Sequence, residues 1–333
     1  MLYTEIENKT ELRTIEELYG LFEKFTKDNP FPDKPSGLYD AVRHIMHIPG
    51  KRLRPILLMA SAEMFGTEAE KAVAAAAAVE WYHNSTLVHD DIMDAADIRR
   101  GIPTVHTLFG VNAAINTGDV MIIKAYEMLA RQSCEVSAKT IAIFSKAAAE
   151  IIEGQTMDLD FETRSDVSEA EYLKMIEFKT SVLLAAALEM GAVIGGANEK
   201  EASAAYAFGK NLGISFQIKD DWLDTFGDAD KIGKKVGGDI SRNKRTLLYL
   251  KALNKADAAQ KNKFEQLQHE TDLDLKISET LILFDELDIK NEVGKTAESY
   301  YHTALNNLEA IQVPEDRKSI LRNLAERIYN RDF

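Results

Sequence analysis

Two stretches of the chain repeat an aspartate triad with the spacing D-D-x-x-D. The first triad lies in LVHDDIMDAADIRRG and the second in FQIKDDWLDTFGD. On a helix, the first and last aspartates of a triad are one turn apart, about 6 Å along the axis, and share a face. Each stretch therefore predicts a row of carboxylate oxygens. The six residues are Asp90, Asp91, Asp94, Asp220, Asp221 and Asp224.

These two rows predict a bound cation. Carboxylates at i and i+4 repel each other by about a few tenths of a kcal/mol, and no lysine or arginine stands at the flanking helical positions before Arg99. Mg²⁺ prefers octahedral oxygen ligation and often completes its shell with substrate phosphates. A single triad is typical of a solvated acidic helix face, but apolar residues such as Leu87 and Phe216 flank these two. The pair therefore indicates a diphosphate site at the border of a core.

Basic residues follow the first triad and recur in the short stretches GKRLRP, FKT, GKK and NKRT. Guanidinium groups bind phosphate through two hydrogen bonds, and lysines bind it as point charges. One diphosphate bridged by metal and a second held by bases would use both signs of charge. Neither G-x-x-x-x-G-K-[ST] nor G-x-G-x-x-G is present, so a nucleotide site is not supported. The basic residues are Lys51, Arg52, Arg54, Arg99, Arg100, Lys179, Lys234, Lys235 and Lys244.

The elements that must position these residues are predicted to be helices. Residues 104–313 contain no proline, and proline is what helix interiors exclude. The same region is rich in strong helix formers, with apolar residues recurring at three and four positions. The three prolines of NPFPDKPSG, 29–37, predict a loop between the first two helices, too short to link domains. The alanine run at 72–83 predicts a tightly packed core helix. We expect an all-α fold and one domain over 1–333.

Composition limits the class of protein. The 333 residues are 45% apolar and 28% charged, as in ordinary globular proteins. A net charge of -14 argues against binding to nucleic acid or to anionic membranes, so any phosphate site must be a local basic pocket. No stretch approaches a membrane helix or a signal-peptide core, which predicts a cytoplasmic location. The single cysteine, Cys134, is expected to be a buried apolar residue.

Five motifs occur in a fixed order: GKRLRP, HNSTLVHDDIMDAADIRRG, EGQTMD, FKT and FQIKDDWLDTFGD. With them the chain resembles the trans-isoprenyl diphosphate synthases, or polyprenyl synthetases, over nearly its whole length. The resemblance implies an all-helical, usually homodimeric enzyme with a central cavity between the helices that carry the triads. It also implies a cluster of Mg²⁺ ions that holds an allylic diphosphate there.

The resemblance assigns roles to single residues. All six aspartates match metal ligands, directly or through water. The isopentenyl diphosphate site corresponds to Lys51, Arg54, His83 and Arg100. The allylic diphosphate site corresponds to Arg99, Lys179, Thr180, Gln217, Lys234 and Lys244, with Gln155 and Asp158 near it. Among these, Lys179, Thr180 and Gln217 are the expected catalytic residues. Because the segment after Lys234 varies in length in the family, Lys235 is an alternative ligand to Lys234.

The implied reaction is a head-to-tail condensation that gives an all-trans prenyl diphosphate. Mg²⁺ and the lysines stabilise the departing diphosphate, and the double bond of isopentenyl diphosphate then traps the allylic cation. His89 is expected to have a structural hydrogen-bonding role. Ser85 and Thr86 are small, so the growing chain should pass them and stop near Tyr82 or Trp81. This favours a C20 product, with C15 and C25 as alternatives.

Two other functions are weaker matches. A class I terpene cyclase would share the first triad, but it typically lacks the second and has no need of GKRLRP. A non-catalytic helical scaffold predicts eroded metal ligands, whereas both triads are intact. The final stretch RIYNRDF, which contains Arg331, is expected to be a frayed terminus without a role.

Overall fold

The protein is described by a computed structural model that covers residues 12–227 and 236–330. Its first half contains α1 (Ile15–Asp28), α2 (Ser36–His47), α3 (Leu53–Met64), the short 3₁₀ helix η1 (Ala69–Lys71), α4 (Val73–Met93), β1 (Ile98–Arg99), β2 (Ile102–Pro103), α5 (Val105–Phe109), α6 (Val111–Leu129) and α7 (Cys134–Thr163). Its second half contains α8 (Glu169–Ile176), the π-helix η2 (Glu177–Ser181), α9 (Val182–Ile194), α10 (Glu199–Phe226), α12 (Gly238–Ser241), α13 (Leu247–Lys255), α14 (Ala258–Gln268), α15 (Leu273–Glu286), α16 (Ile289–Glu309) and α17 (Glu315–Asn330). The predicted all-α class is confirmed.

Local sequence signals explain where these helices begin and end. The proline-rich loop separates α1 from α2, and between residues 104 and 313 the described chain is helix after helix. Four helices begin with a capping box, in which a side chain before the helix and one at its third residue each bond the other's backbone. The boxes pair Thr14 with Glu17, Ser168 with Glu171, Asn198 with Glu201, and Asp257 with Gln260.

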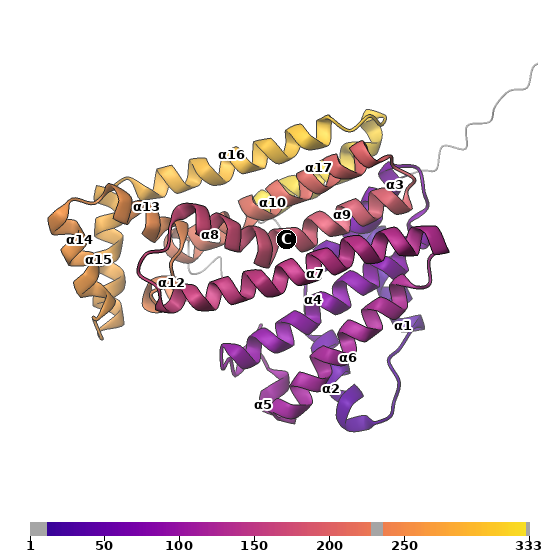
Figure 1. Cartoon of the computed structure of the whole chain (residues 1–333), viewed down its shortest axis with the longest axis horizontal. Helices are drawn as coiled ribbons and strands as arrows, with labels where there is room; N and C mark the ends of the chain where they lie inside the picture. The colour runs from indigo at the N-terminus through magenta and orange to yellow at the C-terminus, as the bar shows by residue number, and fades with distance from the viewer. Residues whose placement is uncertain (1–11, 228–235, 331–333) are drawn as a thin grey trace, which may run out of the picture.

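The long helices pack side by side around a shared interior (Figure 1). The closest pairs along their length are α4 with α6, α10 with α16, α9 with α10, and α3 with α9. In Figure 1, α13, α14 and α15 gather at one end of the long axis, while α2, α5 and α6 lie across α4 and α7 from α16. The helices that carry the two triads, α4 and α10, are therefore both inner elements.

Two apolar clusters stabilise the fold. The larger one joins α1–α4, α6, α7, α9, the start of α10 and α17, and the smaller one joins α8, the end of α10 and α13–α16. Within the larger cluster, the side chains of residues 75–78 in α4 are completely buried. This confirms the tightly packed helix predicted from the alanine run, because only small side chains allow neighbouring helices to approach so closely.

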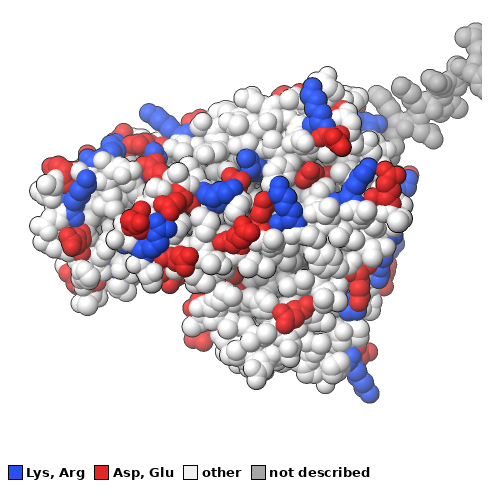
Figure 2. Space-filling model, in the orientation of Figure 1, with Lys and Arg blue, Asp and Glu red and all other residues white. Residues whose placement is uncertain are grey.

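One prediction about the core was wrong. Cys134 is exposed, because it is the first residue of α7 and lies at the solvent end of that helix. None of the helices formed by the described residues is long and apolar enough to cross a membrane. On the face shown in Figure 2, basic and acidic side chains alternate, and that face has no continuous basic surface.

Candidate active site

Both triads contribute to one cavity of about 330 Å³. Its walls come from the end of α4, from α7, from η2, from α10 and from the segment after α12. We call it the active-site cavity. Of the residues singled out in the sequence, its lining includes Asp94, Asp158, Lys179, Thr180, Gln217, Asp221 and Lys244. These residues come from five separate stretches of the sequence. They are up to 150 positions apart, from Asp94 to Lys244, yet they meet in this cavity.

The first triad ends α4 and has one bound and two open carboxylates. Asp91 is buried and accepts hydrogen bonds from Nε of Arg99 at 2.9 and 3.0 Å, with Nη2 at 2.7 Å. Asp90 and Asp94 form no hydrogen bond or ion pair with another described residue. Burial raises the pKa of Asp90, and the ammonium of Lys179 opposes that shift. Two carboxylates one helical turn apart are thus available to a cation.

The second triad, near the end of α10, is held by neighbours. Asp221 accepts hydrogen bonds from the Tyr172 hydroxyl at 2.5 Å and from Nε2 of Gln217 at 2.9 Å. Burial, together with the carboxylate of Asp239, raises the pKa of Asp221 to about 7. Asp224 accepts the backbone N–H of Asp239 at 2.8 Å. These contacts fix the orientation of the row.

Tyr172 and Asp239 contact the second triad, and sequence reasoning did not single them out. Tyr172 lies 49 positions before Asp221 and looks like an ordinary core residue of an amphipathic helix. The sequence gives a weak indication of Asp239. It follows two glycines, which favour a tight turn, and it precedes Lys244 by five residues. Neither contact follows from local spacing.

A π-helix presents Lys179 and Thr180 to the cavity. Single π-turns are rare and recur at functional sites, because they rotate side chains away from the regular helical register. Nζ of Lys179 lies 2.5 Å from Asp158, and the Thr180 hydroxyl donates to Oε1 of Gln217 at 2.9 Å. Gln217 in turn donates to Asp221. One hydrogen-bonded chain thus joins the π-helix to the second triad.

Two glycines make room for this π-helix. A Cβ on Gly154 of α7 would lie 2.4 Å from the backbone nitrogen of Lys179. A Cβ on Gly213 of α10 would lie 2.7 Å from Cα of Ser181. Both approaches are shorter than real Cβ atoms tolerate, so the π-helix is packed directly between the backbones of α7 and α10. The glycine of EGQTMD therefore has a packing role.

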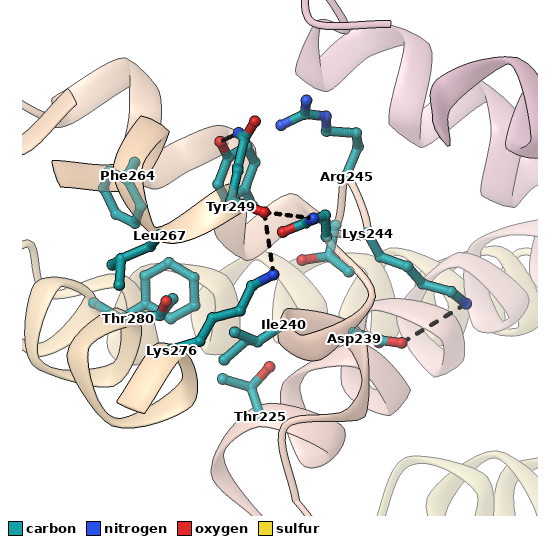
Figure 3. Close-up of a pocket in the computed structure, with 14 residues that line it drawn as sticks. Thr225, Asp239, Ile240, Lys244, Arg245, Tyr249, Phe264, Leu267, Lys276 and Thr280 are labelled. Carbon is teal, nitrogen blue, oxygen red and sulfur yellow. Dashed lines mark hydrogen bonds and ion pairs between the residues drawn. The ribbon is translucent and has the colours of Figure 1, made fainter. Parts of the chain in front are cut away.

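The segment 237–246 closes the cavity. Asp239 forms ion pairs with Arg242 at 3.1 Å and with Lys244 at 3.7 Å. Burial disfavours the charged form of Lys244, but Asp239 and Asp158 outweigh it and the pKa of Lys244 is raised. Figure 3 shows Lys276 of α15 beneath this segment, with its amine 3.5 Å from the carbonyl oxygens of Ser241 and Gln268. Lys234 and Lys235 lie outside the described residues, as does Arg331.

A second charged group, which we call the arginine pocket, consists of Arg54, His83 and Arg100. Nη1 of Arg54 lies 3.1 Å from Nε2 of His83, and Arg100 donates to the backbone oxygen of Pro49. Burial lowers the pKa of Arg54 to about 10, partly opposed by Glu80. Burial and the neighbouring arginines lower the pKa of His83 well below its ordinary value.

The arginine pocket has the charge balance of an anion site. Nε of Arg54 is buried and has no hydrogen-bond partner among the described residues. The nearby Glu80 is already paired with Arg52 at 2.8 Å. Arg54 and His83 are half-buried and Arg100 is exposed. Positive groups held close together and partly out of water are costly unless an anion joins them. Lys51, in the same GKRLRP stretch, is exposed and lines a different cavity, together with Tyr19 of α1 and Leu324 of α17.

Arg100 is placed by a tight hairpin. Strands β1 and β2 pair antiparallel, with Ile98 opposite Pro103 and Arg99 opposite Ile102. Arg100 and Gly101 form the turn with φ of 52° and 78°, the left-handed values that a two-residue hairpin requires. The turn sends Arg99 to Asp91 and Arg100 to the arginine pocket, so adjacent residues serve different sites.

The remaining residues have clear surroundings. His89 lies against Gly118 of α6, with Nε2 3.3 Å from the backbone oxygen of Ile115, a hydrogen bond of the kind that its expected structural role requires. Tyr82 donates to the backbone oxygen of Ala148 of α7 at 2.9 Å. Trp81 instead packs at a tilted angle against Phe31 of the α1–α2 loop. Of the two aromatic residues, Tyr82 is the one on the α7 side.

The arrangement suits Mg²⁺, although no cage is preformed. Among the described residues, no three His, Cys, Asp or Glu side chains stand close enough together to hold a metal ion. Asp90 and Asp94 nevertheless supply open carboxylate oxygens, and Asp94 shares the cavity with Asp221. A metal that keeps several waters or substrate oxygens needs only one or two carboxylates from the protein.

Comparison with known proteins assigns the family. The polyprenyl synthetase family model matches residues 35–281, and the chain belongs to this family. It is 40% identical over 304 residues to a geranylgeranyl diphosphate synthase of Methanosarcina mazei, covering 90% of this chain and 91% of that protein. A crystal structure of a geranylgeranyl pyrophosphate synthase has a TM-score of 0.91 and 42% identity, covering 96% of this chain and 99% of that one.

A further similar structure was solved with ligands bound. It is a geranylgeranyl pyrophosphate synthase from Corynebacterium glutamicum complexed with isoprenyl diphosphate and magnesium. Its TM-score is 0.83 at 28% identity, and the similarity covers 95% of this chain and 98% of that one.

Proposed function

We propose that this protein is a magnesium-dependent prenyltransferase that condenses isopentenyl diphosphate with allylic diphosphates head-to-tail. The product is an all-trans prenyl diphosphate, C20 in length. One observation supports this most directly: the open carboxylate of Asp94 and two lysines share the active-site cavity, while a separate arginine pocket has positive charge that Glu80 compensates only in part. Two distinct anion sites are what a reaction between two diphosphates requires.

The metal would be held first by Asp90 and Asp94, whose oxygens are not engaged by other described residues. Asp91 is bound by Arg99, and Asp221 by Tyr172 and Gln217, so we assign these two to bonding through water or to orienting the rows. Asp220 and Asp224 complete the second row. When bound, Mg²⁺ would stabilise the charge that develops on the departing diphosphate.

Several side chains would promote ionisation of the allylic diphosphate. Lys179 of η2 and Lys244 of the segment after α12 both line the cavity and would offer ammonium groups to the allylic diphosphate. Thr180 and Gln217 also line it, and the hydrogen bond between them fixes their orientation. Because these groups are preoriented, they stabilise developing negative charge without reorganising during the reaction. Lys234 or Lys235, outside the described residues, would add to them.

The arginine pocket would orient the second substrate. Arg54 and Arg100 can bind phosphate oxygens through paired N–H groups, with His83 and Lys51 as further donors. The bound diphosphate would also relieve the mutual repulsion of the positive groups in the arginine pocket. The bound isopentenyl group would then present its double bond to the allylic cation, and the adduct would lose a proton to the released diphosphate.

A C20 product is supported by the size of the residues before the first triad. Ser85 is buried and small, and its hydroxyl is turned back to the Tyr82 carbonyl. Tyr82 is the first large side chain on the α7 side and packs edge-on against Phe144 at 5.2 Å. The name of the Methanosarcina mazei relative agrees with this length.

We also propose a homodimer formed through α6. Val111, Ile115 and Ile123 lie on one face of this helix and are 48%, 43% and 59% exposed. Exposed apolar side chains that share a helix face, here interrupted by the exposed Asp119, mark a contact with another chain. Sedimentation should show a dimer that Ile115→Asp with Ile123→Asp converts to a monomer, whereas Ile282→Asp, at an equally exposed position of α15, leaves it intact. A cytoplasmic location stays a prediction.

The proposed reaction is tested by incubation with isopentenyl diphosphate and each of the C5, C10 and C15 allylic diphosphates. We expect C20 alcohols after dephosphorylation, formed with Mg²⁺ and lost with a chelator. Cyclic hydrocarbons formed from the allylic substrate alone would instead identify a terpene cyclase. Failure to extend any primer with Mg²⁺ present would contradict the proposal.

A further inference from the structure

A cavity of about 660 Å³, which we call the lateral pocket, lies outside the active site. It is formed by α1, the α1–α2 loop, α2 and one side chain of α4, Trp81. Its volume falls within the range of about 300–1,000 Å³ that is usual for sites of small molecules. Nothing in the proposed condensation uses it.

The inner wall of the lateral pocket is apolar. Phe22 of α1 and Trp81 of α4 are 1% and 2% exposed, and Met46 of α2 completes the wall. Phe31 of the loop packs against Trp81, with ring centroids 4.6 Å apart and the ring planes tilted by 45°. An extended hydrocarbon chain would therefore find aromatic and thioether surface over the depth of the cavity.

The rim of the lateral pocket is basic. Lys24 and Lys27 are three residues apart on one face of α1 and are exposed. Within residues 12–227 and 236–330, neither forms an ion pair or a hydrogen bond. Arg43 and His47 of α2 also line the pocket, but Arg43 is ion-paired with Asp40 at 2.5 Å and with Asp33 at 3.7 Å. Glu23 is the one acid in the lining, so the positive charge without a partner is that of the two lysines. This excess of positive charge contrasts with the net charge of -14 of the whole chain.

We propose that the lateral pocket binds an amphipathic anion, a single apolar chain with a phosphate or carboxylate head. The chain would lie on Phe22, Phe31 and Trp81, and the head would be held by Lys24 and Lys27. Apolar depth alone would suit any hydrocarbon, but two unpaired ammonium groups at the mouth select a negative end group.

Arg52 couples the lateral pocket to the arginine pocket. Its guanidinium lines the lateral pocket and binds Glu80 at 2.8 Å, and Glu80 is the carboxylate that stabilises the charge of Arg54. An anion that draws Arg52 outward frees Glu80 to neutralise the arginine pocket. We therefore expect the bound ligand to weaken binding of the second diphosphate, a consequence that rests on the proposed function.

Binding itself is tested without turnover. The chain has two tryptophans, so Trp222→Phe leaves Trp81 as the only indole reporter. Dodecyl phosphate should change its fluorescence in a saturable way, and dodecanol should bind at least tenfold more weakly. Lys24→Glu with Lys27→Glu should weaken dodecyl phosphate binding at least tenfold, whereas Lys34→Glu, on the adjacent loop outside the lining, should leave it unchanged. Equal binding by the double variant, or no saturable signal, would overturn the proposal.

A kinetic measurement tests the coupling. With dodecyl phosphate present, KM for isopentenyl diphosphate should rise severalfold in the native protein and stay constant in the Lys24→Glu, Lys27→Glu variant. An equal rise in both would place the inhibitor in the active site and overturn the coupling. Palmitate and geranylgeranyl phosphate, compared in the Trp81 assay, distinguish two classes of ligand. Tighter binding of palmitate indicates a fatty-acyl anion. Tighter binding of geranylgeranyl phosphate indicates an isoprenoid phosphate.

Discussion

The active-site cavity and the arginine pocket balance their charges in opposite ways. In the cavity, most charged groups have a protein partner: Lys179 has Asp158, Asp91 has Arg99, and Lys244 has Asp239. In the arginine pocket, Arg54 and His83 lie 3.1 Å apart, and burial together with neighbouring arginines lowers the pKa of each.

This difference indicates how each site is completed. Asp94 lines the cavity, Asp90 lies one helical turn before it, and both carboxylates are open, so a cation must bind before a diphosphate can bind there. The arginine pocket carries excess positive charge from the start and can accept its diphosphate directly. Occupation of the two sites should therefore depend differently on metal, and each site should be separable by mutation.

The largest effect is expected when an open carboxylate is removed. Asp94→Asn takes one of the two free oxygen pairs from the metal, and loss of several kcal/mol of transition-state stabilisation lowers kcat about a thousandfold. Isopentenyl diphosphate should still bind in a direct titration, because the arginine pocket is unchanged. Asp97→Asn, an exposed aspartate three residues later, is the matched control and should keep near-native kcat.

The converse change acts on the arginine pocket. Arg54→Gln removes one of the buried charges that face the second diphosphate, and truncation of such a contact costs about 2–5 kcal/mol. KM for isopentenyl diphosphate should rise about a hundredfold, with a much smaller change in KM for the allylic substrate. An equal rise of both constants would show that the two sites are not independent, and Arg43→Gln, an arginine outside the pocket, controls for general loss of charge.

The sequence predicted the parts of this comparison that depend on local spacing. The triads fall on single helices, so their periodicity was sufficient to place Asp90 beside Asp94. The absence of proline was sufficient to predict the helices of residues 104–313. Tyr172 was missed because its contact with Asp221 spans 49 positions. The exposure of Cys134 was missed because a residue type alone does not fix where a helix begins.

The π-helix also lay beyond the sequence signals. FKT contains no residue that requires a π-turn, and the distortion is stabilised by what packs around it. Gly154 and Gly213 come from helices far apart in the chain, and their role depends on backbone approaches below 3 Å from an added Cβ. Such a constraint is visible only after α7, η2 and α10 are packed together.

Gly213→Ala sharpens the comparison from within the cavity. The added methyl must displace Ser181, at an overpacking cost of about 1–3 kcal/mol in the free energy of unfolding. Movement of the π-helix also shifts Thr180 from Gln217, so kcat should fall about tenfold while isopentenyl diphosphate binding is retained. Gly20→Ala, where the new Cβ meets nothing within 4 Å, should keep kcat and is the helical control. Native kcat in Gly213→Ala would mean that the π-helix does not depend on this approach.

The smallest effect concerns the proton on His83. In the free protein its pKa is well below the ordinary value, so the imidazole is neutral near pH 7. A bound diphosphate opposes the arginine charges and raises the pKa of His83, and binding to a group whose pKa rises becomes tighter as the pH falls. The affinity for isopentenyl diphosphate should therefore increase more between pH 8 and pH 6 in the native protein than in His83→Gln. The difference should be severalfold, and the ligand's own titration cancels because it is common to both proteins.

His44→Gln should follow the native profile, since His44 instead contacts the backbone oxygen of Pro103. Coincident profiles for His83→Gln and the native protein would exclude His83 as a group that gains a proton when the anion binds, and would leave Arg54 and Arg100 as the charges that complete the pocket.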